Sequence, residues 1–421
     1  MEEADINLSQ SHLQKNKKIS QARKIRCWLG LLLSILGLAV IVSAYLLLSI
    51  HQLPKPTGPY SVGRIRYHWV DKARPEIFSP VLDDKRELAV TIWYPASSGT
   101  GMHRCDYADY ADNAMAIQHL AGDIGLPGRW FHYLLHHIHP YARIDALLAS
   151  GGPFPVLIFS HGFGSLPEFS TALIEDLSSH GYVIAGVNHA YASLVCPLSN
   201  GRSINFDPLI EQPLDKKRDE LIQVLADDIR YVLTQIVKFN ISDSSGRFSG
   251  MLDMNRVGVF GHSIGGEAAT VACSQDSRFR VGLSLDSNVG AHTRKKHIQV
   301  PFLFLRENWI NMVSDDDLKK MGSTREKLGR QFIDSTFDCL ESDGYILTIN
   351  GFQHYDFTDA PLASALFKLV GITGQVDALR SLRIVNEYSL AVFDRYLRNI
   401  DSQLLKGPSA KYPEIVFIGK R

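Results

Sequence analysis

The sequence contains no CxxC pair and has only five cysteines in 421 residues. Because structural zinc sites commonly use such pairs, we expect no metal. Lys and Arg balance Asp and Glu at 44 each, so no net basic charge favours binding to nucleic acid. Neither glycine nor proline is in excess, and the chain has no internal repeat, so a globular protein with a large core is expected.

One long apolar run lies near the N-terminus. Residues 27–50, CWLGLLLSILGLAVIVSAYLLLSI, carry no charge. As a helix they would span roughly 36 Å, enough to cross a bilayer core of about 30 Å. Residues 1–26 hold six basic and three acidic residues, which predicts a cytoplasmic N-terminal tail and places the rest of the chain on the far side. We expect an uncleaved signal anchor; cleavage near Val42 and Ala44 is the alternative.

The order of the following elements predicts an α/β fold. Residues 51–60 form a short proline-containing linker, and a catalytic domain is expected over residues 61–421. An antiparallel pair of strands is predicted first, and apolar runs then alternate with helices, which is typical of a mostly parallel sheet wrapped by helices. The predicted strands are residues 63–70, 87–94, 155–160, 182–189, 256–261, 280–285, 301–305 and 345–350, and the predicted helices are residues 165–180, 215–239 and 382–398. Ser165 and Glu168 have the spacing of a capping box.

Residues 106–150 interrupt the strand series as a predicted cap-like helical insertion rich in aromatic residues and histidines. Apolar residues at helical spacing either contact lipid or pack on the domain itself; they are Trp130, Phe131, Leu134, Leu135 and Ile138. His132 and His136 lie one helical turn apart, but no third ligand is evident, so a metal site is not expected there.

The motif GHSIGGEAA at residues 261–269 predicts a nucleophile elbow. It follows a β-branched strand and begins a helix, which is the strand–turn–helix setting that a nucleophilic serine needs. The serine of such a turn has strained backbone, so its neighbours Gly261 and Gly265 must lack side chains. We therefore predict Ser263 as the nucleophile.

A nucleophilic serine needs a histidine base and an acid that orients it, in the chain order serine, acid, histidine. His354 follows the predicted strand 345–350 and fits the base. Asp286 and Glu307 each end a predicted strand, so topology leaves both open as the acid. The run at residues 315–317 is instead predicted to be a solvated helix start.

Two backbone amides are expected to form the oxyanion hole. One is the amide of Ile264, which follows the serine, and the other lies in the turn SHGFGS at residues 160–165, where we assign it to Phe163. His161 in the same turn is expected to be structural. No cofactor is required.

These segments resemble a known family. FSHGFG, DLSSHGYVIAGVNH, RVGVFGHSIGGEAA, LSLD and GFQHYDFTD occur in the order seen in plasma-type platelet-activating factor acetylhydrolases, which belong to the α/β-hydrolase superfamily. The resemblance covers about residues 57–417 and implies a calcium-independent, group VII phospholipase A2-like esterase acting on short or oxidised sn-2 acyl chains. The family's acid lies 23 residues after the serine, which implies Asp286, and its oxyanion donors match Phe163 and Ile264.

Two features depart from that family. Its plasma-type members are secreted, whereas this chain has an expected anchor, and residues 106–150 match poorly. The sequence therefore predicts a membrane-anchored, extracytoplasmic serine esterase with phospholipid or another small ester as substrate. A general carboxylesterase of the dienelactone- or polyester-hydrolase type and a catalytically inactive, membrane-tethered binding domain are the alternatives.

Overall fold

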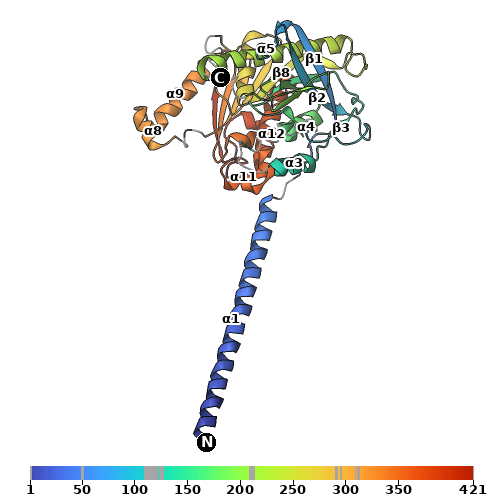
Figure 1. The fold of residues 1–421 in the computed structure, drawn as a ribbon. Coiled ribbons are helices and arrows are strands. Elements are labelled where there is room, and N and C mark those ends of the chain that lie inside the picture. The colour runs from blue at the N-terminus through green and yellow to red at the C-terminus, as the bar shows by residue number, and fades with distance from the viewer. Residues whose placement is uncertain are drawn as a thin grey trace. The chain divides into compact units, whose positions relative to one another are not determined.

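Figure 1 shows the fold in a computed structural model, which describes residues 2–48, 52–108, 122, 128–207, 214–289, 293, 296–308, 310 and 313–420. The chain divides into two compact units. Residues 1–49 with 364–366 form the first unit, and the second comprises residues 50–363 and 367–421.

The first unit is built on one long helix, α1, over Glu2–Leu48. Within it, Arg23–Tyr45 has a mean hydropathy of 2.4, and none of its most apolar window is buried. This segment is long and apolar enough to cross a membrane, and a signal sequence has the same properties. The basic residues that precede the apolar run belong to the same helix.

The second unit is built on a ten-stranded sheet with the order β12-β11-β10-β9-β8-β4-β5-β2-β1-β3. The six central strands from β11 to β5 are parallel, while β12 and β2 run antiparallel to their inner neighbours. The predicted α/β fold with a mostly parallel sheet is confirmed. The strands are β1 Ser61–Pro75, β2 Lys85–Ala96, β3 Arg143–Ile144, β4 Phe154–Ser160, β5 Val183–His189, β8 Leu252–His262, β9 Val281–Leu285, β10 Phe302–Glu307, β11 Gly344–Ile349 and β12 Ile415–Lys420.

Helices cover both faces of this sheet (Figure 1). Successive side chains of a strand point to opposite faces, and β4 shows the result: Val156 packs in one core cluster with α5 and α6, whereas Leu157 packs in the other with α4 and α12. The strand is buried on both faces, which explains its uninterrupted apolar sequence. These helices are α4 Thr171–Ser179, α5 Leu214–Ile241, α6 Ile264–Gln275 and α12 Ala378–Phe393.

Shorter elements complete the second unit. Ser314 caps the start of α8 by accepting a hydrogen bond from the Asp317 amide, so the acidic run does begin a helix, as predicted. The elements are β6 Val195–Pro197, β7 Ser203–Asn205, α3 Gly128–His137, α8 Asp315–Lys320, α9 Arg325–Phe337, α10 Ala360–Ala363, α11 Ala365–Leu369, the 3-10 turns Pro167–Ser170, His354–Phe357 and Gln403–Leu405, and a π turn Asp394–Arg398.

The predicted helix start and capping box at Ser165 are wrong. Ser165 belongs to a turn in which its amide donates to the Gly162 carbonyl oxygen, and Pro167 begins a short 3-10 turn before α4. Glu168 does not cap the helix, because its buried carboxylate accepts a hydrogen bond from the Thr91 hydroxyl. The interaction with β2 therefore competes successfully with the local cap.

Residues 106–150 are only partly helical. Helix α3 lies in this range, but β3 pairs parallel with β1, so the helical prediction is wrong for Arg143–Ile144. Trp130 and Phe131 are buried in a core cluster with Leu166 and Phe367, which confirms that α3 packs on its own domain. Residues 109–121 and 123–127 of the expected insertion, and the side chain of Leu134, lie outside the described part of the chain.

Candidate active site

Ser263 lies in a tight turn between β8 and α6. Its backbone has φ 54° and ψ −128°, a conformation that costs free energy for a residue with a side chain. A Cβ atom on Gly261 would lie 2.2 Å from the Gly265 carbonyl oxygen, and one on Gly265 would lie 2.2 Å from that of Ser160. Glycine is thus required at both positions to let the turn pass this close to α6 and β4.

Asp286 and His354 come together at the ends of two other strands. Asp286 follows β9, and His354 begins the 3-10 turn after β11. The His354 Nδ1–H donates to Asp286 Oδ2 over 2.5 Å, and the Glu307 amide donates to Asp286 Oδ1 over 3.0 Å. Burial opposes ionisation of Asp286, but its hydrogen bond with His354, the charge of His354, the Glu307 amide and the charge of Arg306 together outweigh burial and hold the pKa of this carboxyl below its usual value. Asp286 is therefore an ionised partner for the imidazole.

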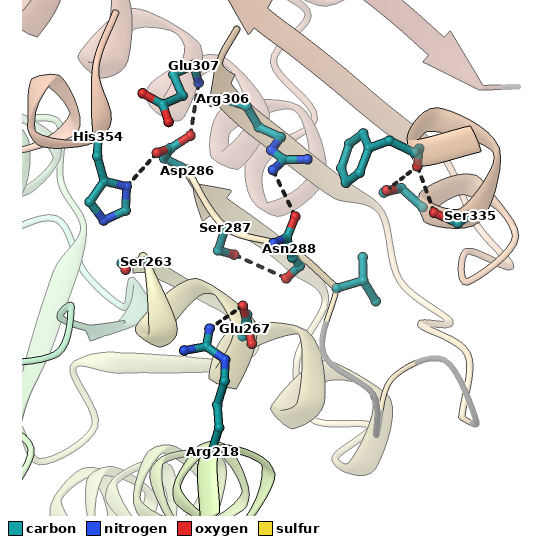
Figure 2. A pocket seen from close by; sticks show the side chains of 13 residues that line it. Arg218, Ser263, Glu267, Asp286, Ser287, Asn288, Arg306, Glu307, Ser335 and His354 are labelled. Atoms are coloured by element: carbon teal, nitrogen blue, oxygen red, sulfur yellow. Dashed lines mark hydrogen bonds and ion pairs between the residues drawn. The ribbon is translucent and has the colours of Figure 1, made fainter. Parts of the chain in front are cut away.

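Ser263, Asp286 and His354 line one pocket of 440 Å³ (Figure 2). Glu307 lines the same pocket, but its side chain makes no hydrogen bond or ion pair with His354 among the described residues. Burial, together with the charge of Asp286, raises the pKa of Glu307 to about 7. Of the two acids that topology left open, Asp286 is thus the one that contacts the imidazole.

The two expected oxyanion donors flank Ser263. Ile264 is the first residue of α6, so its amide has no acceptor one turn earlier in the helix. The loop after β4 passes close to the serine, because a Cβ atom on Gly162 would lie 3.3 Å from Ser263 Cβ. Within the described residues, the next amide, that of Phe163, donates to no protein acceptor. Both N–H groups are therefore available to an oxygen atom bound near Ser263.

Two further histidines near the serine are buried and held by hydrogen bonds. Burial lowers the pKa values of His161 and His262 to about 3, so both rings are neutral at physiological pH. His161 contacts the Gly162 carbonyl oxygen and the Ser193 hydroxyl, and His262 Nε2 lies 3.0 Å from the His354 carbonyl oxygen. These contacts use the rings to fix the loops on either side of Ser263.

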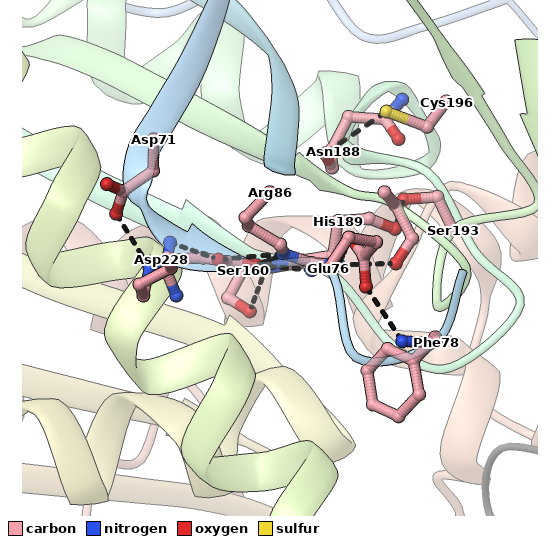
Figure 3. A network of polar contacts seen from close by, with 12 residues as sticks. Asp71, Glu76, Phe78, Arg86, Ser160, Asn188, His189, Ser193, Cys196 and Asp228 are labelled. Carbon is pink, nitrogen blue, oxygen red and sulfur yellow. Dashed lines mark hydrogen bonds and ion pairs between the residues drawn. The ribbon is translucent and has the colours of Figure 1, made fainter. Parts of the chain in front are cut away.

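A second Ser–His–Asp chain lies deeper in the domain (Figure 3). His189 Nε2 lies 2.9 Å from Ser160 Oγ, and His189 Nδ1 lies 2.9 Å from Asp228 Oδ2, which also forms an ion pair with Arg86. All these groups are buried. Burial alone would raise the pKa of Asp228, but the charge of Arg86 and the hydrogen bonds with His189 and Arg86 together keep it far below its usual range. The chain joins the ends of β4 and β5 to α5 and so supports the strand that precedes the Phe163 loop. Its motif was not apparent in the sequence.

Among the described residues, no three His, Cys, Asp or Glu side chains lie close enough to hold a metal ion. The rings of His132 and His136 have centroids 4.6 Å apart on α3. The sheet and this pocket define an α/β-hydrolase with the chemical groups of a serine esterase.

The comparison with known protein families identifies the family of α/β-hydrolases to which the chain belongs. The family described as platelet-activating factor acetylhydrolase, isoform II, matches residues 47–201 and 208–409, and the chain belongs to this family. The resemblance seen in the sequence and the predicted class, a carboxylic ester hydrolase, are thus confirmed.

Individual relatives and one solved structure have names that agree with an ester hydrolase. The platelet-activating factor acetylhydrolase of Cavia porcellus is 24% identical over 390 residues, covering 84% of this chain and 81% of that protein. A probable 1-alkyl-2-acetylglycerophosphocholine esterase of Arthroderma benhamiae is 24% identical over 394 residues, covering 87% and 93%. Among solved structures, a ferulic acid esterase from Streptomyces cinnamoneus matches with a TM-score of 0.69 and 25% identity, covering 88% of this chain and all of that one.

Proposed function

We propose that the protein is a serine esterase that removes short or oxidised sn-2 acyl chains from phospholipids through an acyl-enzyme. The observation that carries this proposal is the bond between His354 and ionised Asp286 in the pocket that Ser263 lines. The names of the curated relatives, which refer to sn-2 acetyl phospholipids, support the substrate class.

The proposed reaction has two halves. His354 accepts the proton of Ser263 as the hydroxyl attacks the ester carbonyl, and Asp286 holds the imidazole in the tautomer that can do so. The Phe163 and Ile264 amides stabilise the negative charge on the carbonyl oxygen. His354 then gives its proton to the leaving lysophospholipid, and the same groups direct a water molecule onto the acyl-enzyme.

A small apolar cavity next to this site supports the proposal that the substrate carries a short acyl chain. The cavity measures 120 Å³, is bordered by Phe163 and Gly164 of the oxyanion loop and by Tyr355 beside His354, and has walls from α3 and α11. Pockets for drug-sized ligands measure about 300–1,000 Å³. A cavity this small favours an acetyl or similarly short chain over a full-length fatty acyl chain.

The apolar helix supports a further part of the proposal, namely that the enzyme is a single-pass membrane protein. Arg23–Tyr45 would cross the bilayer, with the basic segment before it in the cytoplasm and the catalytic domain in the periplasm, lumen or extracellular space. Protease treatment of intact and opened vesicles tests this orientation. In intact inside-out vesicles the catalytic domain should be protected, and protease should digest it only after the vesicles are opened. If the anchor is not cleaved, the N-terminus should remain attached to the catalytic domain.

Activity assays on the full chain in detergent test the esterase itself. We expect hydrolysis of sn-2 acetyl phosphatidylcholine to exceed that of sn-2 palmitoyl phosphatidylcholine, and Ser263→Ala to abolish both hydrolysis and labelling by a fluorophosphonate. Preference for a ferulate or polymer ester over the phospholipid would favour a general carboxylesterase instead. Equal labelling of wild type and Ser263→Ala, or of neither, would indicate an inactive binding domain.

A further inference from the structure

Arg306 is a buried cation in the proposed active-site pocket, and most of its hydrogen-bonding capacity is unused. It lies on β10 and lines the same pocket as Ser263 and His354 (Figure 2), and the residue is 5% exposed. One guanidinium N–H donates to Asn288 Oδ1 over 2.9 Å. Nε and Nη1 are buried, and neither has a hydrogen-bond partner in the described part of the chain.

The acids around Arg306 do not neutralise it by direct contact. No ion pair joins Arg306 to a carboxylate within the described ranges. Asp286 is held by His354, and Glu267 pairs with Arg218 over 2.7 Å. Buried guanidinium groups are normally paired and hydrogen-bonded, because an uncompensated buried charge is strongly destabilising. The arrangement therefore calls for a ligand that supplies acceptors.

An aromatic ring fixes the orientation of the guanidinium. Its central carbon lies 3.9 Å from the centroid of Phe332 on α9, which is a stacking distance. Stacking occupies one face of the planar group and leaves its edge to make hydrogen bonds. Nε and Nη1 are thus oriented donors on different sides of the guanidinium, and each can donate to one anionic oxygen.

We propose that Arg306 binds an anionic oxygen group of the ester substrate, either the phosphodiester of the lipid head group or the terminal carboxylate of an oxidised acyl chain. The inference rests on the proposed function, since it places this group in the pocket where the ester is cleaved. Both groups present oxygens with shared negative charge, which can accept hydrogen bonds from the unpartnered guanidinium donors. Arg306 thereby selects among esters that Ser263 can attack equally well.

Matched substrate pairs test the proposal on the full chain in detergent. The head-group pair is 1-alkyl-2-acetylglycerol and its phosphocholine derivative, and the acyl pair is p-nitrophenyl butyrate and p-nitrophenyl hydrogen glutarate. For Arg306→Met we expect the ratio of kcat/KM for the member that carries the anionic group to that for the member that lacks it to fall by about 10- to 100-fold in one pair. This is the size expected for the loss of charge-assisted hydrogen bonds. Arg306→Lys keeps the positive charge but not the planar guanidinium, so its ratio should fall less than that of Arg306→Met.

The control variant is Arg330→Met, which removes an exposed cation from the same helix that carries Phe332. It should leave both ratios as in wild type. A fall in the head-group pair assigns the subsite to the phosphodiester, and a fall in the acyl pair assigns it to the carboxylate. Ratios unchanged in both pairs, or equal losses for the two members of each pair, would overturn the inference.

Binding without turnover separates this inference from the proposed function. Calorimetry on Ser263→Ala with glycerophosphocholine and with glutarate measures the two anionic groups directly. We expect one of them to bind at least 10-fold more weakly when Arg306→Met is added. If neither weakens, Arg306 is not an anion site, whereas weakening in a protein that hydrolyses no phospholipid would overturn the proposed activity alone.

Discussion

The change of Asp286 to Asn tests the proposed triad most sharply, because it keeps the shape of the side chain and removes one acceptor. Asp286 accepts two hydrogen bonds, from His354 Nδ1–H and from the Glu307 amide. An Asn side chain has one acceptor oxygen and one amino group for these two donors. If the oxygen stays with the Glu307 amide, the amino group faces His354 and forces its proton onto Nε2.

That tautomer cannot accept a proton from Ser263. The equivalent change in serine proteases lowers kcat by about 10⁴-fold for this reason, and we expect a fall of about 10³- to 10⁴-fold here. Such a fall corresponds to about 4 to 5.5 kcal/mol of transition-state stabilisation. The value of KM should change little, because Asp286 lies behind the imidazole and acts through it.

The matched control is Glu307→Gln. This change keeps the backbone amide that bonds to Asp286 and removes a carboxyl that makes no hydrogen bond or ion pair with His354 among the described residues. Steady-state hydrolysis of p-nitrophenyl acetate, with active sites counted by the fluorophosphonate, should give a kcat within about tenfold of wild type. The reasoning is refuted if Asp286→Asn keeps more than a tenth of the wild-type kcat, or if Glu307→Gln falls as far.

Three further predictions concern a buried ion pair, the turn around Ser263 and the pH dependence of stability. Arg86→Met leaves Asp228 buried without its main partner and should lower the free energy of unfolding by about 3–5 kcal/mol, measured by denaturant titration. Gly265→Ala brings a Cβ to 2.2 Å from the Ser160 carbonyl oxygen and should abolish fluorophosphonate labelling, while circular dichroism reports whether the helices persist. The folded-state pKa of Glu307, about 7, exceeds its ordinary value of 4.5, so the unfolded chain releases this proton first and wild-type stability falls as pH rises between these values. Glu307→Gln should make the Tm fall less between pH 5 and 7.5, and an unchanged slope would contradict this assignment.

Patterns with a local physical cause could be predicted from the sequence. The glycines around Ser263 mark crowding that any such turn requires, and the uninterrupted apolar run of β4 marks a strand buried on both faces. Elements whose structure depends on distant partners are harder to predict from the sequence. The helix start at Ser165 was wrong because Glu168 is held by β2, and the six residues of β12 become a strand by pairing with β11.

The acid of the proposed triad could be predicted only in part from the sequence. Asp286 and Glu307 end adjacent parallel strands, so both approach the same edge of the sheet, and residue type and topology do not distinguish them. The family resemblance pointed to Asp286 by spacing. In the structure the distinction is geometric, because only Asp286 lies within bonding distance of the imidazole, and its own carboxylate is braced by the Glu307 amide. The neighbouring acid thus contributes its backbone to the site.

The buried Ser160–His189–Asp228 chain shows why residue types and bonds alone do not identify a reactive serine. Its two bonds of 2.9 Å link the same three residue types as the proposed site, yet all three of its residues are buried. The side chain of His354, in contrast, is 38% exposed and faces the cavity that Ser263 lines. A general base must exchange protons with a substrate and then with water. Access of the imidazole to the pocket therefore separates the proposed catalytic group from the structural one, and this property depends on how distant segments pack.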